Sequence, residues 1–535
     1  MKVLTQKKEA SFVKGALILA IAGVLVKVIG AVFRIPLTNL VGKYTMGLYS
    51  IAYRYYSIFL TIATAGIPIA ISKMVSESRA LGRPRETKKV FRMAITLCLV
   101  IGALGMLILI VFSNPLAAAT KDINAQMSII ALAPAVLFMA VTAGFRGYFQ
   151  GHENMLPTAL SQIIEAFSRL LIGLAIAWIF LSRGFAEKYV SAGIILGITT
   201  GTVLTVLLML GFALRNKKKP ESMSGETLES RKNSEILSSL LKIAIPVTVG
   251  SFVMNLTSTI DMYLITDRLA SLGYNNEQTT GLFGIYENYA LPLFNLIPSI
   301  IISLNVSVTP TISAAHAVGD REKLHKTLLS ALRIVIIITL PASIGISVLA
   351  KPILSILFVS QADVAIAAPV LSILGIASFF LCASSLTSTS MQALGHATLP
   401  LITMLCGAVV KIVANYVLIA IPGIELSGAA IGTVLCYVLI MVLNMIFLAR
   451  LVKFKPKFIA TYLRPLISAC IMGAVVFAVY KLALPFVGNL VAVVASIGIG
   501  VVVYFVAMLA SKGITEDDVK GLPKGEKIAK ILFKK

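Results

Sequence analysis

Charged residues are scarce in this sequence. Aspartate, glutamate, lysine and arginine make up 13% of the 535 residues, 58% are hydrophobic, and the mean hydropathy is +0.93. This composition lies outside the range of soluble globular proteins. Apolar stretches of about 20 residues, long enough to cross a hydrocarbon core of about 30 Å as helices, recur along the whole sequence. The sequence therefore predicts an all-α, multi-pass membrane protein and excludes a single membrane anchor.

Cysteines and the sequence motifs of common enzymes are also scarce. The five cysteines fall inside apolar segments at irregular spacing, which indicates neither a disulfide framework nor a zinc site. His152 and His396 lie in matching Gly-His turns, where a role in the turn is favoured over metal binding. The sequence contains no Walker A motif, no H-E-x-x-H motif and no nucleophile elbow within a soluble domain. We therefore expect no enzymatic activity, no metal and no cofactor.

Acidic residues are few beside the basic ones, and the formal net charge is +24. Such a charge can indicate nucleic-acid binding, but no basic soluble domain is present to hold it, so we expect no nucleic-acid partner. We count fourteen apolar runs, among them 12–35 and 46–72. Of the 47 lysines and arginines, 33 fall on one side of the predicted membrane, eight on the other and six within the runs. This asymmetry predicts that both termini are cytoplasmic.

The sequence contains an internal repeat. "GLYSIAYRYYSIFL" from Gly47 resembles "GLFGIYENYALPLF" from Gly281, and a later parallel places Arg169 opposite Lys411. Repeats of this kind usually place a substrate between two halves. The predicted organisation is listed in chain order: an N-terminal lobe of six helices (1–213), a cytoplasmic linker (214–240), a second, pseudo-symmetric lobe of six helices (241–450), two further helices (451–510) and a basic cytoplasmic tail (511–535).

Three cations lie inside the first two predicted spans. Lys27 and Arg34 share one face of the first span with Gly23 and Gly30, and Arg54 lies at a similar depth in the second. An unpaired cation facing lipid costs about 2.5–3.5 kcal/mol, so we expect these side chains to face a watery cavity or a partner. The second span carries a small, polar face that favours a cavity, although close helix packing is an alternative: Ser50, Arg54, Ser57, Thr61 and Ala65.

An anionic ligand is the interpretation that accounts for these cations together. Glu165 is the only acid deep in the first half, and it lies four residues before Arg169, so we expect those two side chains to pair. A phosphate suits the remaining cations because arginine and lysine supply several charge-assisted donors to its oxygens. Lys27, Arg34 and Arg54 are therefore the candidate binding residues, and Arg169 is a further candidate beside them. The alternative for each is a paired charge or one that extends to the membrane surface.

The second half differs from the first at the matching positions. Asn255 and Asn288 stand where Lys27 and Arg54 stand in the first half. Asp261 and Lys411 lie in the middle of their spans, and an ion pair between them is one hypothesis for their presence there. A proton- or sodium-coupling site that uses Asp261, Asn255 and Asn415 is the other.

Helix-breaking residues interrupt two spans that the repeat makes equivalent. Gly66 and Pro68 interrupt the second span, and Pro292 and Pro298 interrupt the eighth. We interpret these positions as candidate gates. The alternative is that the prolines are simply tolerated within packed membrane helices.

Several segments resemble one protein family over nearly the whole chain. These are "KGALILAIAGVLVKVIGAVFRIPL", "GIPIAISKMVSE", "FRGYFQGHENMLPTALSQIIEAFSR" and the tail "ITEDDVKGLPKGEKI". Together they resemble the SpoVB/YtgP branch of the polysaccharide transporters, in the MOP superfamily that also holds the MurJ lipid II flippases and the MATE drug exporters.

The resemblance implies a fourteen-helix MOP flippase fold in the bacterial cytoplasmic membrane. It implies alternating-access export of undecaprenyl-diphosphate-linked saccharides for wall, spore-cortex or capsule assembly. Membrane lipids and wall-synthesis enzymes are further candidate partners. Some relatives bind sodium with acidic residues on the seventh and eleventh spans. Here Asp261 matches the first of these, but Lys411 stands near the position where the second acid would help. A MATE-like cation-coupled exporter and a non-transporting scaffold for wall-synthesis enzymes are the alternatives, and the basic first lobe argues against the MATE-like exporter.

Overall fold

The computed structural model describes residues 2–216, 231–453, 459–511 and 513. Within these ranges the side chains of residues 2–18 and of some later positions, Lys27 among them, are outside the described part. Most of the predicted linker 214–240 and of the predicted tail 511–535 also falls outside it. The chain divides into two compact units, Met1–Gly284 and Ile285–Lys535.

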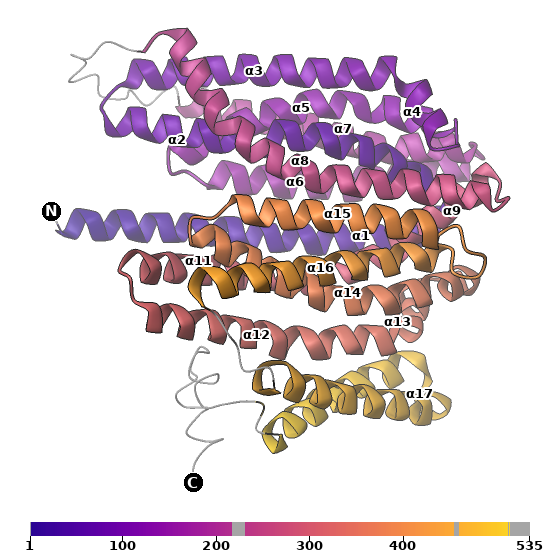
Figure 1. Cartoon of the computed structure of the whole chain (residues 1–535). Coiled ribbons are helices and arrows are strands. Elements are labelled where there is room, and N and C mark those ends of the chain that lie inside the picture. The colour runs from indigo at the N-terminus through magenta and orange to yellow at the C-terminus, as the bar shows by residue number, and fades with distance from the viewer. Residues whose placement is uncertain (1, 217–230, 454–458, 512, 514–535) are drawn as a thin grey trace. The chain divides into compact units, whose positions relative to one another are not determined.

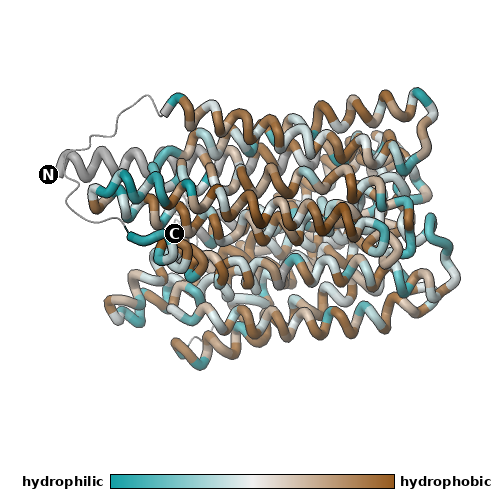
Figure 2. Tube along the Cα trace, turned by 90° about the horizontal axis from the view of Figure 1, so that it is seen from above, coloured by the Kyte–Doolittle hydropathy of each residue, from teal (hydrophilic) through white to brown (hydrophobic). Residues whose placement is uncertain are grey.

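The regular elements of the described ranges are helices, with apolar residues along their lengths and hydrophilic residues mostly near their ends (Figure 2). Ten of the helices in these ranges are long and apolar enough to cross a membrane. The prediction of an all-α, multi-pass membrane protein is therefore confirmed. Two of the ten are kinked stretches of 48 and 52 residues, Phe33–Ala80 and Ile459–Ala510. The count of fourteen spans stays a prediction.

The first unit is a bundle of long helices (Figure 1). Its elements are α1 (Lys2–Thr64), α2 (Ile67–Ala80), α3 (Pro84–Val111), α4 (Ser113–Ala119), α5 (Ala125–Gly151), α6 (Leu156–Ser182), α7 (Glu187–Asn216), α8 (Asn233–Ser271) and most of α9 (Asn276–Ile285). The predicted second lobe begins at residue 241, whereas contacts place α8 in the first unit. The predicted lobes are defined by the internal repeat of the sequence, whereas the two units are defined by contacts. The division into lobes therefore stays a prediction.

Helix α1 has two limbs that fold back on each other at Gly42. This residue has φ 79° and ψ 173°, a conformation that glycine adopts without the steric cost of a side chain. In a straight helix residues 34 and 49 would lie about 22 Å apart, yet the Arg34 guanidinium lies within electrostatic range of Tyr49. The predicted spans 12–35 and 46–72 therefore correspond to the first limb, residues 2–41, and to the second limb, residues 43–64, continued by α2.

The second limb ends where the sequence predicts a break. Helix α1 stops at Thr64, and α2 begins at Ile67 with Gly66 as its N-cap and Pro68 in its first turn. Proline fits the first turn of a helix because its missing N–H would have no partner there. Gly66 also allows a close approach, since a Cβ there would lie 2.1 Å from the carbonyl oxygen of Ala244 in α8. The gating role proposed for Gly66 and Pro68 stays a prediction.

Helix α9 crosses the second limb of α1 at glycines. A Cβ on Gly47 would lie 2.2 Å from the Thr280 carbonyl oxygen, and one on Gly284 would lie 2.2 Å from the Lys43 carbonyl oxygen. Small residues let membrane helices approach closely and gain dispersion contacts. The buried Thr280 hydroxyl also donates to a carboxylate oxygen of the buried Asp122, at 2.9 Å. These contacts fasten α9 to the first unit.

The second unit begins with an interrupted helix. Its elements are η1 (Tyr286–Ala290), α10 (Leu291–Phe294), α11 (Leu296–Ala317), α12 (Arg321–Val348), α13 (Ala350–Leu357), α14 (Gln361–Ala393), α15 (Thr398–Leu418), α16 (Leu426–Val452), η2 (Ile459–Leu463) and α17 (Arg464–Ala510). Pro292 lies in the first turn of α10 and Pro298 near the start of α11, so the chain breaks where these prolines fall. Their gating role stays a prediction.

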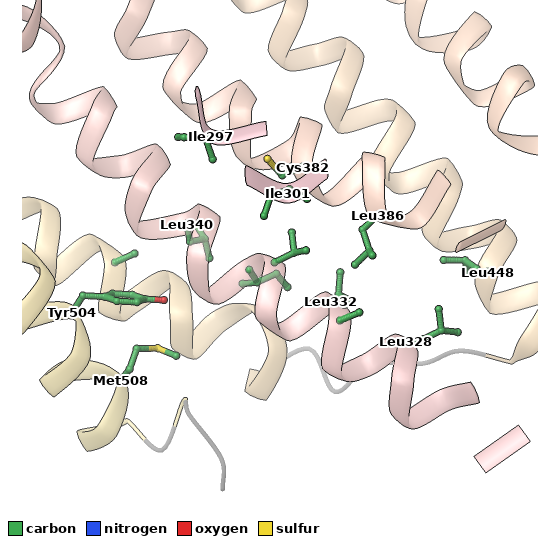
Figure 3. Packing of buried hydrophobic residues seen from close by; sticks show 14 of the residues in the cluster. Ile297, Ile301, Leu328, Leu332, Leu340, Cys382, Leu386, Leu448, Tyr504 and Met508 are labelled. Carbon is green, nitrogen blue, oxygen red and sulfur yellow. The ribbon is translucent and has the colours of Figure 1, made fainter. Parts of the chain in front are cut away.

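Apolar side chains from α11, α12, α14, α16 and α17 form the core of the second unit (Figure 3). Leu332, Cys382 and Met508 are almost completely buried within it. Helix α17 is bent at Gly488, with φ 75° and ψ 169°, and its C-terminal part contributes Tyr504 and Met508 to this core.

Candidate functional site

Three tyrosines on the second limb of α1 form a cluster. Tyr49, Tyr53 and Tyr56 are spaced by four and three residues, which places their rings on one helix face. The Tyr49 and Tyr53 ring centroids lie 6.0 Å apart with nearly parallel planes, and those of Tyr53 and Tyr56 lie 5.7 Å apart. Tyr49 and Tyr56 are buried and Tyr53 is half-buried. We call these three residues the tyrosine cluster.

Two of the predicted binding arginines meet at the tyrosine cluster. The Arg169 guanidinium of α6 lies over the Tyr53 ring, 5.5 Å from its centroid, where the negative ring face attracts a cation. Arg34, on the first limb of α1, and Arg169 both lie within electrostatic range of Tyr49. The Nε of Arg169 is buried and has no hydrogen-bond partner among the described residues.

Glu165 lies between two arginines. One carboxylate oxygen lies 3.5 Å from a terminal nitrogen of Arg169, and the other lies 3.3 Å from a terminal nitrogen of Arg146. The predicted Glu165–Arg169 pair is thus confirmed. The structure places Arg146 inside α5 with only 13% of its side chain exposed. Glu165 is therefore shared, and we call Arg146, Glu165 and Arg169 the ionic triad.

The hairpin of α5 and α6 brings Arg146 to Glu165. Arg146 and Ser161 are equally far along the chain from the middle of the turn 152–155, so an antiparallel hairpin sets them side by side. The Arg146 Nε donates to the Ser161 hydroxyl at 2.9 Å, and that hydroxyl donates to the Thr158 carbonyl oxygen at 2.6 Å. Because Glu165 lies one helical turn after Ser161, the same arginine reaches both side chains. This symmetry about the turn could have indicated the contact from sequence.

The other predicted cations lie elsewhere. The backbone of Lys27 is part of α1, but its side chain is outside the described part of the chain. Arg54 is half-buried and follows Tyr53, so it projects about 100° around the helix from the tyrosine cluster. The structure thus gathers Arg34 and Arg169 on the tyrosine cluster and places Arg54 on a different face.

The predicted small, polar face of the second limb packs partly against α8. Thr61 is buried, and its hydroxyl accepts a hydrogen bond from the Asn255 side-chain amide at 2.7 Å. The hydroxyls of Tyr55 and Tyr263 are also hydrogen-bonded between these helices. At these positions the structure favours the alternative of close helix packing.

Three of the four candidate coupling residues are buried, and the fourth, Asn255, is half-buried. Asp261 of α8 is 7% exposed, and Lys411 and Asn415 of α15 are 9% and 0% exposed. Asn415 lies close to α16, since a Cβ on Gly432 would be 2.0 Å from the Asn415 side-chain oxygen. Asp261 belongs to the first unit and Lys411 to the second, and the ion pair between them stays a prediction.

An ionic cluster at the start of α3 was missed by the sequence reasoning. The Glu86 side chain is completely buried, and its carboxylate oxygen accepts hydrogen bonds from Arg231 at 2.7 Å and from Ser78 at 3.1 Å. Arg231 also lies 3.8 Å from Glu77. The contact joins the residues just before α8 to the α2–α3 corner. The two partners are 145 residues apart, and no local spacing signals such a pair.

No group of three or more histidine, cysteine, aspartate or glutamate side chains that could hold a metal ion occurs within the described ranges.

Comparisons with known proteins agree with this architecture. A family model described as "Polysaccharide biosynthesis protein" matches residues 12–316, and the MatE model matches residues 288–417. Stage V sporulation protein B of Bacillus subtilis (strain 168) is 26% identical over 522 residues, which cover 96% of this chain and 98% of that protein.

Two solved structures extend the likeness to the fold. An inward closed conformation of lipid II flippase MurJ has a TM-score of 0.68 at 19% identity and covers 92% of this chain and 98% of its own. An inward-facing MATE transporter of the MOP superfamily has a TM-score of 0.64 at 16% identity and covers 80% and 94%. The resemblance noted in the sequence is confirmed, and the fold is like that of MurJ and of the MATE transporter.

Proposed function

Since the chain belongs to the polysaccharide biosynthesis protein family, we propose that it is a flippase of lipid-linked saccharide precursors. It exports undecaprenyl-diphosphate-linked saccharides, lipid II or a related glycan, across the bacterial cytoplasmic membrane by alternating access. The product feeds cell-wall, spore-cortex or capsule synthesis. The family match, the likeness to stage V sporulation protein B and the MurJ-like fold support the proposal.

The convergence of arginines within apolar helices is the observation that carries the proposal. Arg34 comes from the first limb of α1, Arg146 from α5 and Arg169 from α6, and Glu165 is the carboxylate that Arg146 and Arg169 share. Guanidinium groups within a membrane are costly and usually mark the path of a substrate or ion. Arginine matches the oxygens of a phosphate with several donors at once. A diphosphate headgroup suits this site, with Lys27 as a further proposed ligand; Arg54, on another face of α1, is proposed to contact a different part of the substrate.

We propose two alternatives for the buried polar residues: an ion pair between Asp261 and Lys411 that keeps both charged within the membrane, or a proton- or sodium-coupling site of Asp261, Asn255 and Asn415. The burial of Asp261, Lys411 and Asn415 supports either role. The breaks at Gly66–Pro68 and at Pro292–Pro298 are proposed to let α2 and α11 tilt as gates. Both termini are proposed to face the cytoplasm.

A MATE-like, cation-coupled exporter is the second candidate, because the MatE model matches residues 288–417. The two candidates differ in the charge of the substrate. A site for cationic drugs should present acidic groups, whereas the site at the tyrosine cluster gathers arginines.

Transport in proteoliposomes tests the proposal. Purified protein is reconstituted with a fluorescent undecaprenyl-diphosphate disaccharide, and an impermeant quencher reports its movement between leaflets. We expect the unchanged protein to accelerate this movement, and Arg34→Gln combined with Arg169→Gln to abolish it. Arg183→Gln, on the exposed end of α6, is the matched control and should transport normally.

Two outcomes would contradict the proposal. Movement of a cationic dye but not of the lipid-linked saccharide would favour the MATE-like exporter. A scaffold for wall-synthesis enzymes would be favoured if cells whose protein carries both Lys27→Gln and Arg54→Gln exported their precursor normally at normal protein levels.

A further inference from the structure

We propose that Glu165 is the specificity-determining counter-ion of the cationic site. Arg146 holds it, it occupies Arg169 while the site is empty, and a phosphate oxygen of the substrate displaces it from Arg169. This inference rests on the proposed function, because it names how the same site discriminates among anions.

The two arginines of the ionic triad are bonded unequally. Arg146 donates to Ser161 at 2.9 Å and to Glu165 at 3.3 Å, so two side chains of α6 hold it. Arg169 lies 3.5 Å from Glu165, and its buried Nε has no partner among the described residues. Glu165 thus accepts a hydrogen bond from Arg146 and makes an ion-pair contact with Arg169, so it can leave Arg169 without losing every partner.

Arg169 has donors that its contacts with the described residues do not use. Its guanidinium lies over the Tyr53 ring, 5.5 Å from the ring centroid. The donors of a guanidinium lie along its edge, so this contact with the ring does not consume them. The side chain is 21% exposed and Tyr53 is half-buried. Arg169 is thus oriented but not fully bonded.

Charge decides which ligand displaces the carboxylate. Glu165 brings one negative charge to Arg169, whereas a diphosphate brings at least two, distributed over several acceptor oxygens. A ligand with a single weak negative charge gains little over the resident carboxylate. Glu165 therefore disfavours weakly charged ligands, because a ligand must carry more negative charge than this carboxylate in order to displace it from Arg169.

Binding measurements on full-length protein in nanodiscs test the exchange, with undecaprenyl diphosphate and undecaprenyl phosphate as probes. Glu165→Gln removes the competing charge, so we expect the Kd for the diphosphate to fall about three- to tenfold. The Kd for the monophosphate should fall by a larger factor, and the preference for diphosphate should narrow. Glu322→Gln, which removes a carboxylate on the exposed start of α12, should leave both Kd values unchanged.

Two further variants separate competition from a structural role. Glu165→Asp keeps the charge, so its Kd values should stay close to those of the unchanged protein even if its melting temperature falls. Glu165→Gln combined with Arg169→Gln should bind as Arg169→Gln does alone, because the competition acts through Arg169.

An unchanged or higher Kd in Glu165→Gln would overturn the inference, since a residue that only positions Arg169 gives that result. Tighter binding on addition of Glu165→Gln to Arg169→Gln would also overturn it. If the unchanged protein shows no saturable binding of either probe, the proposed function fails and the exchange fails with it.

Discussion

The crossing of α1 and α9 at Gly47 supports a quantitative prediction for Gly47→Ala. The added Cβ would lie 2.2 Å from the Thr280 carbonyl oxygen, whereas ordinary contact begins at 3.4 Å. The two helices must therefore separate by about 1.2 Å, since the atom that the methyl group meets belongs to the backbone. The same movement pulls the Thr280 hydroxyl away from the Asp122 carboxylate, which it contacts at 2.9 Å.

Both effects lower the stability of the first unit. Overpacking of this kind costs about 1–3 kcal/mol, and loss of a hydrogen bond to a buried carboxylate costs about 1.5–3 kcal/mol. Because the helices relax part of the way, we expect a total loss of about 2–4 kcal/mol. The midpoint of thermal unfolding of the first unit in detergent should then fall by about 3–7 °C.

Gly211→Ala is the matched control for this measurement. Gly211 lies in α7, and a Cβ there would meet no atom within 4 Å. Alanine also has the higher helix propensity, so this variant should melt at or slightly above the temperature of the unchanged protein. A midpoint for Gly47→Ala within 1 °C or so of the Gly211→Ala midpoint would refute the close approach of α9 to α1.

Four other substitutions are expected to have measurable effects. Asp261→Asn and Lys411→Met should each alter the dependence of transport on sodium, pH or membrane potential, and unchanged dependence in both variants would remove the coupling hypothesis. Arg231→Gln leaves the buried Glu86 without its closest partner, so proteolysis at the α2–α3 corner should become faster, and an unchanged cleavage rate would contradict this. Asn255→Ala removes the hydrogen bond between α8 and α1 and should lower the melting midpoint by about 2–4 °C; no change would show that this bond contributes nothing to stability.

Much of the fold follows from local patterns in the sequence. The apolar runs predict membrane helices, Gly66 and Pro68 predict the break before α2, and the spacing of Glu165 and Arg169 predicts their pair. Each of these features depends on residues within about one helical turn of one another. Such short-range geometry is fixed by the helix itself.

The features that the sequence did not reveal depend on packing between helices. The Arg146–Glu165 contact needs the α5–α6 hairpin, and the pair of Glu86 with Arg231 joins distant segments. The tyrosine cluster has helical spacing, but its meeting with Arg169 requires α1 to lie against α6. From the sequence alone, the polar face around Thr61 is compatible with a cavity or with helix packing. In the structure, Asn255 of α8 packs against this face and donates a hydrogen bond to Thr61.

The ionic triad also bears on how the chain enters the membrane during synthesis. Inserted alone, α6 would carry Glu165 and Arg169 into the bilayer, and α5 would carry Arg146 near one of its ends. A charged side chain costs up to about 2.5–3.5 kcal/mol at the bilayer centre. A short turn joins the two helices, and Arg146 reaches Glu165 as soon as the hairpin closes. The hairpin, rather than either helix, is therefore the unit that should leave the translocon. A longer turn at 152–155 would delay the meeting of Arg146 with Glu165 during insertion, and we expect it to lower the yield of inserted protein.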